Sequence, residues 1–281
     1  MKRSVLSALA VFSVAAPLLL VTAPASAATV AMPYDFDGNG YPDLAVGAPG
    51  LRINAVRNAG GVITLPASAT GLSHTEKIIS QSSLGVPGGS ETGDRFGYAV
   101  TSADFNRDGY ADLAVGHPGE AIGAVEQAGS VTVIYGSNKG PDTTTSVGIA
   151  QPGGAVASAE WGYALAVGDF NVDGYPDLAV GAPGDDPEDI DEEEFLPSGT
   201  VRILPGSAGG ISTAGVRVFR RQLPDANVSG FDIRFGEALA AGDLDGDRDT
   251  DLVVGSHGYE YVPDARDGSV SYCAALPGGP S

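Results

Sequence analysis

The feature that most constrains the fold is an acidic segment that recurs four times along the chain. "DFDGNGYPDLAVGAP" starts at Asp35, "DFNRDGYADLAVGHP" at Asp104, "DFNVDGYPDLAVGAP" at Asp169 and "DLDGDRDTDLVVGSH" at Asp243. The four starts lie 69, 65 and 74 residues apart. Self-similarity at a long and regular period indicates a repeat architecture in which each repeat is one supersecondary unit.

The residues around each acidic segment predict four short strands per repeat. In the second repeat, apolar stretches at 96–105, 112–118, 129–136 and 143–151 alternate with turn residues, without helical periodicity. Four antiparallel strands in such a unit are typical of a β-propeller blade. A solenoid is the competing architecture, but its repeats are usually shorter, about 20–45 residues. We therefore expect an all-β propeller with blades near 28–83, 84–151, 152–223 and 224–281, the last one incomplete.

The first 27 residues have the features of a secretory signal peptide. Lys2 and Arg3 precede an apolar run from Val5 to Val21, and small residues at Ala25 and Ala27 stand at the cleavage spacing. No second apolar run of membrane-spanning length follows, so we expect a secreted protein without a membrane span. An uncleaved membrane anchor is the alternative interpretation.

The charge of the chain excludes some partners and favours others. The formal net charge is −20, and it becomes more negative when Lys2 and Arg3 are removed with the signal peptide. Such a surface repels nucleic acid and anionic membranes, and it suits divalent cations. Cys273 is the single cysteine, which rules out an intrachain disulfide. We interpret it as a small apolar strand residue rather than as an intermolecular link.

The acidic segment starting at Asp104 has the composition of a cation-binding loop. Numbered from this residue, oxygen-bearing side chains stand at positions one, three, five and nine, and a glycine stands at position six. Oxygens on alternate residues of a tight turn converge on one point, and calcium accepts six to eight oxygen ligands, including a carbonyl such as that of Tyr110. An EF-hand needs a glutamate at position twelve, where this chain has Val115. A solvated acidic turn without metal remains the other alternative.

The paired motifs "RFGYAV" and "DFNRDGYADLAVGHP" resemble FG-GAP repeats, the blades of the integrin alpha-subunit propeller and of many secreted bacterial proteins. The resemblance covers essentially all of the chain after the signal peptide. It implies up to four structural calcium ions, each held in the loop between the first and second strands of a blade. The implied ligands are Asp35, Asp37, Asn39, Tyr41 and Asp43; Asp104, Asn106, Asp108, Tyr110 and Asp112; Asp169, Asn171, Asp173, Tyr175 and Asp177; and Asp243, Asp245, Asp247, Asp249 and Asp251. The tyrosines and Asp249 would contribute carbonyl oxygens.

The chain departs from the family pattern in three repeats. The first lacks the Phe-Gly pair, the third has Trp161 in its place, and the fourth has Arg248 where the others have glycine. We expect a strained turn at Arg248, because glycine adopts unusual backbone angles most easily. Integrin-type propellers have seven blades. We therefore expect the chain to form part of a larger propeller, an open arc or a closed four-bladed ring. The first is favoured, because an unpaired blade edge carries a risk of aggregation.

The sequence predicts a binding function rather than catalysis. His74, His117 and His257 match neither a zinc-binding spacing nor a nucleophile motif, and we expect them in loops or at the blade rim. The prediction is a non-enzymatic, extracellular adhesion or ligand-binding module for protein or glycan. The alternative is a remnant of a larger exported enzyme or lectin, because FG-GAP repeats also occur beside enzymatic domains.

One charged segment and several loops are candidate partner surfaces. Eight of the ten residues from Asp185 to Glu194 are acidic, and they fall on the face opposite the cation loops. This run is either a solvated insertion or a patch for a basic partner or weakly held cations. The loops between blades, around Arg95, Trp161 and Arg234, are the further candidates.

Overall fold

The computed structural model describes residues 30–185, 199–220, 234–247, 249–256 and 274–276. Within these ranges the secondary structure is β, apart from one three-residue 3-10 helix. No helix in the described part is long and apolar enough to cross a membrane. Residues 1–27, Arg248, His257 and Cys273 lie outside the described residues, and so do the predictions made for them, including that of a signal peptide.

Blades two and three are four-stranded antiparallel meanders, as the repeat predicts. In both, the first strand enters the acidic loop and the second leaves it, because the loop turns the chain back on itself. The sheet orders are β6-β7-β8-β9 and β10-β11-β12-β13. The bounds are β6 Ala99–Ala103, β7 Asp112–His117, β8 Ser130–Ile134 and β9 Val147–Ala150, then β10 Ala164–Gly168, β11 Asp177–Ala182, β12 Thr200–Leu204 and β13 Arg217–Arg220.

Blades one and four each show three strands among the described residues. Blade one has the order β1-β2-β5, so β1 corresponds to β7 and β11 but pairs with no inner strand within residues 30–185. Blade four has the order β14-β15-β16 and keeps its inner strand β14. The bounds are β1 Leu44–Ala48, β2 Gly61–Leu65, β5 Lys77–Ile79, β14 Ala238–Gly242, β15 Asp251–Gly255 and β16 Ala274–Leu276, with a small hairpin of β3 Ala67–Ser68 and β4 Gly71–Leu72.

The fourth strand of blade two begins later than the sequence predicts. Instead of a strand over 143–151, a 3-10 helix, η1, spans Thr143–Thr145 before β9 begins. Asp142 causes this turn, because its Oδ1 accepts hydrogen bonds from the backbone nitrogen of Thr144 at 3.0 Å and from its Oγ1 at 2.7 Å. Aspartate favours such caps and turns over continued strand.

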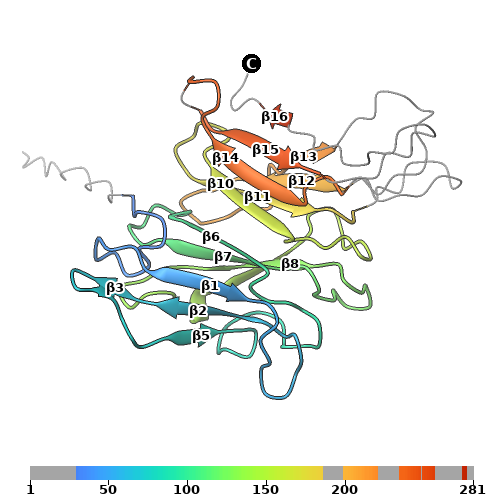
Figure 1. Ribbon diagram of the computed structural model, residues 1–281. Coiled ribbons are helices and arrows are strands. Elements are labelled where there is room, and N and C mark those ends of the chain that lie inside the picture. The colour runs from blue at the N-terminus through green and yellow to red at the C-terminus, as the bar shows by residue number, and fades with distance from the viewer. Residues whose placement is uncertain (1–29, 186–198, 221–233, 248, 257–273, 277–281) are drawn as a thin grey trace, which may run out of the picture.

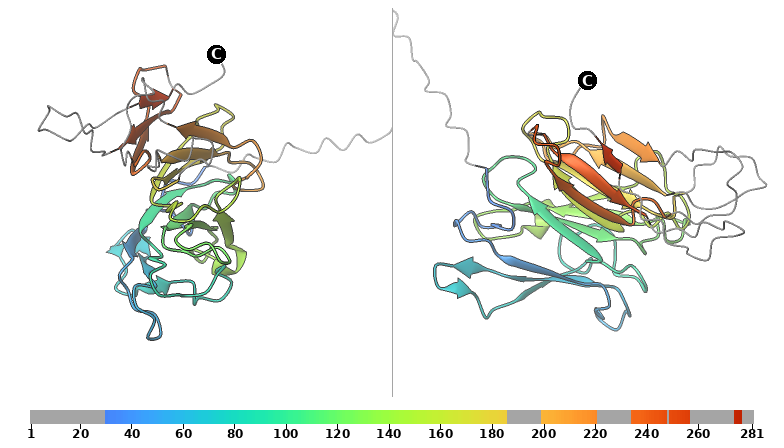
Figure 2. Two further views of the ribbon diagram at one scale, coloured as in Figure 1. Left: turned by 90° about the vertical axis from the view of Figure 1, so that its right-hand side faces the viewer. Right: turned by 45° about the horizontal axis from the view of Figure 1, so that its top comes forward.

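The four sheets stack face to face in chain order, from blade one to blade four (Figure 1). Side chains from facing sheets form three hydrophobic clusters, one at each junction between successive blades. The left-hand view of Figure 2, turned by 90°, shows the same stacking from the side. In blades two and three the second strand therefore has neighbours on both of its faces, and β7 and β11 are buried along their whole length.

Two glycines meet at each junction between successive blades. Their close contact explains why glycine recurs at these positions in the repeats of this chain. A Cβ on Gly116 of β7 would lie 2.0 Å from the carbonyl oxygen of Gly162, which follows Trp161 in blade three. The same 2.0 Å approach joins Gly47 to Gly97. Because no side chain fits there, glycine at this position lets successive blades approach closely. The repeated apolar residues thus serve to pack successive blades together. Because the blades repeat, every acidic loop lies at the same end of its blade.

Candidate functional site

The candidate site is the set of four acidic loops, named here loop one (35–43), loop two (104–112), loop three (169–177) and loop four (243–251). Their backbone turns through left-handed conformations at position four in every loop. Position six is also left-handed in loops one to three, where it is glycine. Position four is Gly38, Arg107, Val172 and Gly246, with φ of +67°, +57°, +59° and +85°.

The carboxylate at position one holds the turn together in loops one to three. In loop two, the Oδ1 of Asp104 accepts the backbone N–H of Asp108 at 3.0 Å, and its Oδ2 accepts that of Gly109 at 3.1 Å. Asp35 and Asp169 make the corresponding pairs of bonds. These residues therefore lie where the turn is tightest, with their oxygens directed into it.

Positions three and five carry the next two oxygen-bearing side chains. Each accepts the backbone N–H two residues ahead, as Asn106 and Asp108 do at 3.1 and 3.0 Å in loop two. In loops one to three one of the two is an asparagine, whose amide donates to the neighbouring carboxylate at 2.9–3.0 Å. The amide relieves the repulsion that two adjacent carboxylates would have.

The aspartate at position nine links the loop to two other parts of its blade. The Oδ2 of Asp112 accepts the N–H of Phe105 at 2.9 Å, and its Oδ1 accepts that of Gly136, beyond β8, at 2.9 Å. Asp43 and Asp177 make the same two types of bond. The sequence prediction treated this residue only as a ligand. In the first three repeats, a small residue followed by serine after the third strand is the signal that could have indicated the second bond.

Burial of the position-nine carboxylates has an electrostatic cost. The pKa of Asp112 is raised to about 7, chiefly by removal from water and in part by the charges of Asp108 and Asp104. The two backbone hydrogen bonds act in the opposite direction and lower this pKa. The pKa of Asp177 rises to about 6 for the same reasons. A divalent cation in the loop would favour the ionised form of these groups.

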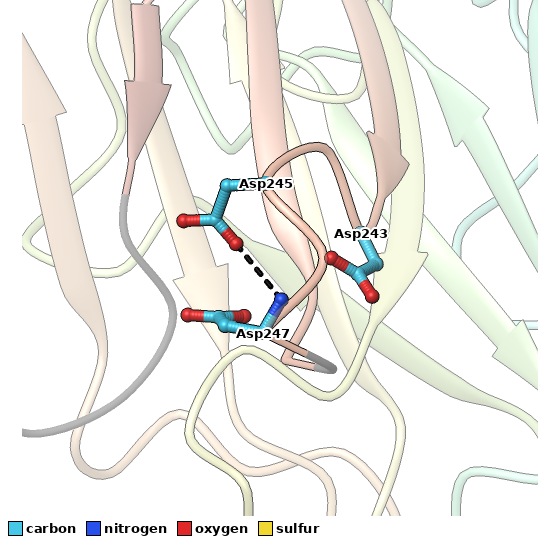
Figure 3. Close-up of side chains that lie close together, drawn as sticks. All are labelled: Asp243, Asp245 and Asp247. Atoms are coloured by element: carbon cyan, nitrogen blue, oxygen red, sulfur yellow. Dashed lines mark hydrogen bonds between the residues drawn. The ribbon is translucent and has the colours of Figure 1, made fainter.

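Loop four brings three carboxylates together and has no asparagine side chain among them, unlike loops one to three (Figure 3). Ligand oxygens of Asp243, Asp245 and Asp247 lie within 4.8 Å of one another, and all three residues are exposed. No other group of three or more acidic, histidine or cysteine ligands in the described ranges is this close. The Oδ1 of Asp249 is buried and has no hydrogen-bond partner among the described residues, so its carboxylate is not held as those at position nine are.

The donor set of the four loops fits a hard cation. Each loop offers carboxylate or amide oxygens at positions one, three, five and nine, and a carboxylate that accepts two N–H bonds still has lone pairs to offer. Calcium takes such oxygens in flexible geometry. The structure thus brings the predicted ligands of each loop to one turn, and it gathers those of loop four most closely.

Two residues expected at the surface are buried instead. His117 is the last residue of β7 and is 2% exposed, with its Nε2 3.0 Å from the Oγ1 of Thr132. The prediction of a loop or rim position was therefore wrong for this histidine. Asp185 is also buried, with its Oδ2 2.9 Å from the Nη1 of Arg202. It belongs to the core of blade three, and the rest of the acidic run lies outside the described residues.

The loops between blades are joined by a network of salt bridges. Glu160 contacts Arg95 at 3.5 Å and Arg234 at 2.7 Å, so it joins blades two, three and four. Trp161 is fully buried, and its Nε1 donates to the carbonyl of Ile149 at 3.1 Å. Trp161 is therefore a core residue and not part of a partner surface between the blades.

Comparison with known proteins matches this architecture. The model of the FG-GAP repeat family matches residues 26–65, 96–134, 161–204 and 235–273. The chain is 40% identical to human (Homo sapiens) phosphatidylinositol-glycan-specific phospholipase D over 171 residues, 58% of this chain and 18% of the relative.

Integrin alpha subunits are similar over comparable lengths. Integrin alpha-PS5 of Drosophila melanogaster is 33% identical over 208 residues, 72% of this chain and 19% of the relative. Human integrin alpha-6 is 34% identical over 164 residues, 57% of this chain and 12% of the relative. The chain thus spans about a fifth or less of the length of these relatives. Because the family model covers more than half of it, the chain belongs to the FG-GAP repeat family and is an integrin alpha-like β-propeller protein.

Proposed function

We propose that this protein is a calcium-stabilised extracellular module that binds protein or glycan ligands and has no catalytic role of its own. The observation that carries the proposal is the repeated loop geometry, in which oxygens at positions one, three and five surround the same tight turn. The calcium would neutralise carboxylates that otherwise repel one another, and so hold each loop in one conformation. Similarity to integrin alpha subunits supports the extracellular assignment.

A groove beside loop two supports the binding role. It has a volume of about 530 Å³ and lies between this loop and the turns after β8 and β12. Tyr110 and Tyr135 line it with aromatic rings, and Asn138 and Asp142 line it with polar groups. Aromatic faces combined with a few fixed polar groups are the usual lining of small-ligand sites, and they suit the alternating apolar and hydroxyl surfaces of a sugar.

A second candidate function is part of a larger exported enzyme or lectin. The observation in its favour is the 40% identity to the phospholipase D, which covers only 18% of that relative. In that case the loops would have the same structural role, and the chemistry would belong to residues outside the matched segment.

Calcium titration with site variants tests the primary proposal. Asp108→Ala and Asp173→Ala should each lower the calcium stoichiometry by one in isothermal titration calorimetry, because each loses a position-five ligand. Calcium at a hundredfold excess over its dissociation constant should stabilise the parent by about 2.7 kcal/mol per site in thermal melts. Asp249→Ala is the matched control, and it should keep the stoichiometry, since position seven contributes a carbonyl.

The ligand half of the proposal is tested on the same samples. The parent should be retained on immobilised polysaccharide or extracellular-matrix protein in calcium, and a chelator should weaken the retention. Melting curves that superimpose with calcium and with chelator would refute the structural role of calcium. Retention on neither support would refute the binding role independently of it.

A further inference from the structure

The two ends of the blade stack expose opposite halves of one interface that the chain builds three times inside itself. Each internal junction has a base, made of Leu and Val from the second strand of the later blade. It also has a cover, made of the position-two residue of the acidic loop and of a small residue in the second strand of the earlier blade. At the first junction the base is Leu113 and Val115, and the cover includes Phe36 and Ala45.

The base residues are fully buried wherever a preceding blade covers them. Their relative exposure is 0% in blades two, three and four, at Leu113, Val115, Leu178, Val180, Leu252 and Val254. In blade one, the corresponding Leu44 and Val46 are 40% and 43% exposed. They point away from blade two, since Ala45 between them packs into the first junction.

The exposed base of blade one extends across the whole sheet. Leu44 pairs with Leu65, Val46 pairs with Ile63, and Ile63 pairs with Ile78, so all five side chains lie on one face. Directly paired residues of antiparallel strands point to the same side of the sheet. We name this five-residue surface the trailing face.

The cover residues show the converse pattern at the other end. Phe36 and Phe105 are fully buried and Phe170 is 2% exposed, each against the next blade. Leu244 occupies the same position in loop four and is 58% exposed. Val253, which corresponds to Ala45, is partly exposed in β15. We name Leu244 and Val253, with the exposed Ala240 of β14, the leading face.

We propose that the leading face of one copy of this chain docks on the trailing face of a second copy, as a head-to-tail continuation of the blade stack. The partner is a second copy because the missing half of each junction is present, exposed, at the other end of the same molecule. Leu244 then covers Leu44 and Val46 as Phe36 covers Leu113 and Val115. The contact is heterologous, so each copy keeps one free face unless the assembly closes.

The net charge of −20 sets the salt dependence of this contact. Two strongly acidic copies repel each other, and salt screens that repulsion over about 8 Å at physiological ionic strength. An apolar contact between like-charged molecules should therefore strengthen as sodium chloride is raised. A contact made by ion pairs would weaken under the same conditions.

Complementation between two variants tests the proposal. Val46→Asp disables the trailing face and Leu244→Asp disables the leading face. Each should weaken self-association at least about tenfold in sedimentation-velocity runs, because an unpaired charge is costly to bury in an apolar contact. A mixture of the two should form a one-to-one dimer, since each variant retains the face that the other lacks. Leu84→Asp is the control, because Leu84 is 84% exposed and belongs to neither face.

Circular dichroism and melting curves establish that each variant folds, and Ile78→Asp is a second trailing-face variant if Val46→Asp does not. The proposal predicts association of the parent and of Leu84→Asp, loss in the single variants, and recovery in the mixture. A parent that stays monomeric over the accessible concentrations would overturn it. So would association that persists in all variants, or single variants that the mixture does not rescue.

Discussion

At the scale of single residues, the buried carboxylates of the described ranges divide into those with a cationic partner and those held by hydrogen bonds alone. Asp185 has the guanidinium of Arg202 at 2.9 Å, whereas Asp94 is 2% exposed, accepts the backbone N–H of Glu91 and contacts no cation among the residues that the structure describes. Burial raises the pKa of Asp94 to about 6, and the charges of Glu120 and Glu91 contribute to the rise. Burial therefore destabilises the ionised form of Asp94 and favours the protonated form in the folded protein.

Asp94 should make stability fall as pH rises from about 4 to about 6. The unfolded chain loses this proton near its ordinary pKa of 3.8, while the folded chain retains it up to about 6. The folded state binds more protons in this window, so its relative stability declines with increasing pH. In Asp94→Asn, melting temperature measured against pH should lose this decline relative to the parent.

The control for this experiment is Asp142→Asn, which should change the profile in the opposite sense. Hydrogen bonds from Thr144 lower the pKa of Asp142, so its ionised form stabilises the fold above its ordinary pKa. Equal profiles for the parent and Asp94→Asn would contradict the assignment.

The spacing of the twenty candidate ligands is local, so the sequence was sufficient to assign them to four acidic turns, of which loops one to three share one hydrogen-bond pattern. The second hydrogen bond of Asp112, to Gly136, joins residues 24 apart, and only the pairing of β7 with β8 brings them together. The burial of His117 likewise depends on Thr132, which lies across the sheet. Local patterns predict turns, whereas contacts made across strands require the register.

At the scale of elements, the strands follow the apolar runs, and the differences arise at their ends. The sequence predicted a strand over 96–105, whereas β6 spans Ala99–Ala103, because Gly97 adopts a φ of +84° where it contacts the preceding blade. The glycine contacts between blades therefore limit the inner strands as well as fixing the distance between sheets.

Gly116→Ala should destabilise the protein by about 1–3 kcal/mol or more, because overpacking against backbone leaves little room to relax. Its new Cβ would be 2.0 Å from the carbonyl oxygen of Gly162. Gly255→Ala is the matched control at the same blade position, where the nearest neighbour is the Cβ of Ala238 at 3.2 Å. Chemical denaturation should show a loss below about 1 kcal/mol for the control. Similar losses for both variants would mean that the junction does not set the requirement for glycine.

At the scale of the whole molecule, the stack is held by contacts between neighbouring blades. The three hydrophobic clusters join blades one and two, two and three, and three and four. Stability in such an array is approximately a sum over units and nearest-neighbour interfaces. The sequence predicted this periodicity but not the exposed faces at the two ends, since exposure depends on which blades are adjacent.

Removal of one complete repeat should leave a folded protein. Deletion of residues 104–168 joins Ala103 to Asp169, and blade one would then pack on Leu178 and Val180 in place of Leu113 and Val115. We expect a cooperative thermal transition at a lower temperature, because one interface is lost. Deletion of residues 104–163 removes a similar length out of phase, and it should abolish the cooperative transition. A loss of folding in both deletions would show that coupling extends beyond neighbouring blades.

The equivalence of the three junctions has a consequence for the gene. Unequal recombination between two repeats, aligned at the same phase, adds or removes one whole blade and regenerates a junction of the same residue types at the crossover. Leu or Val would again meet Phe or Leu there, and glycine would again meet glycine. Blade number can therefore change in a single genetic event without a compensating substitution, so the number of blades is more readily altered in evolution than the structure of any one blade.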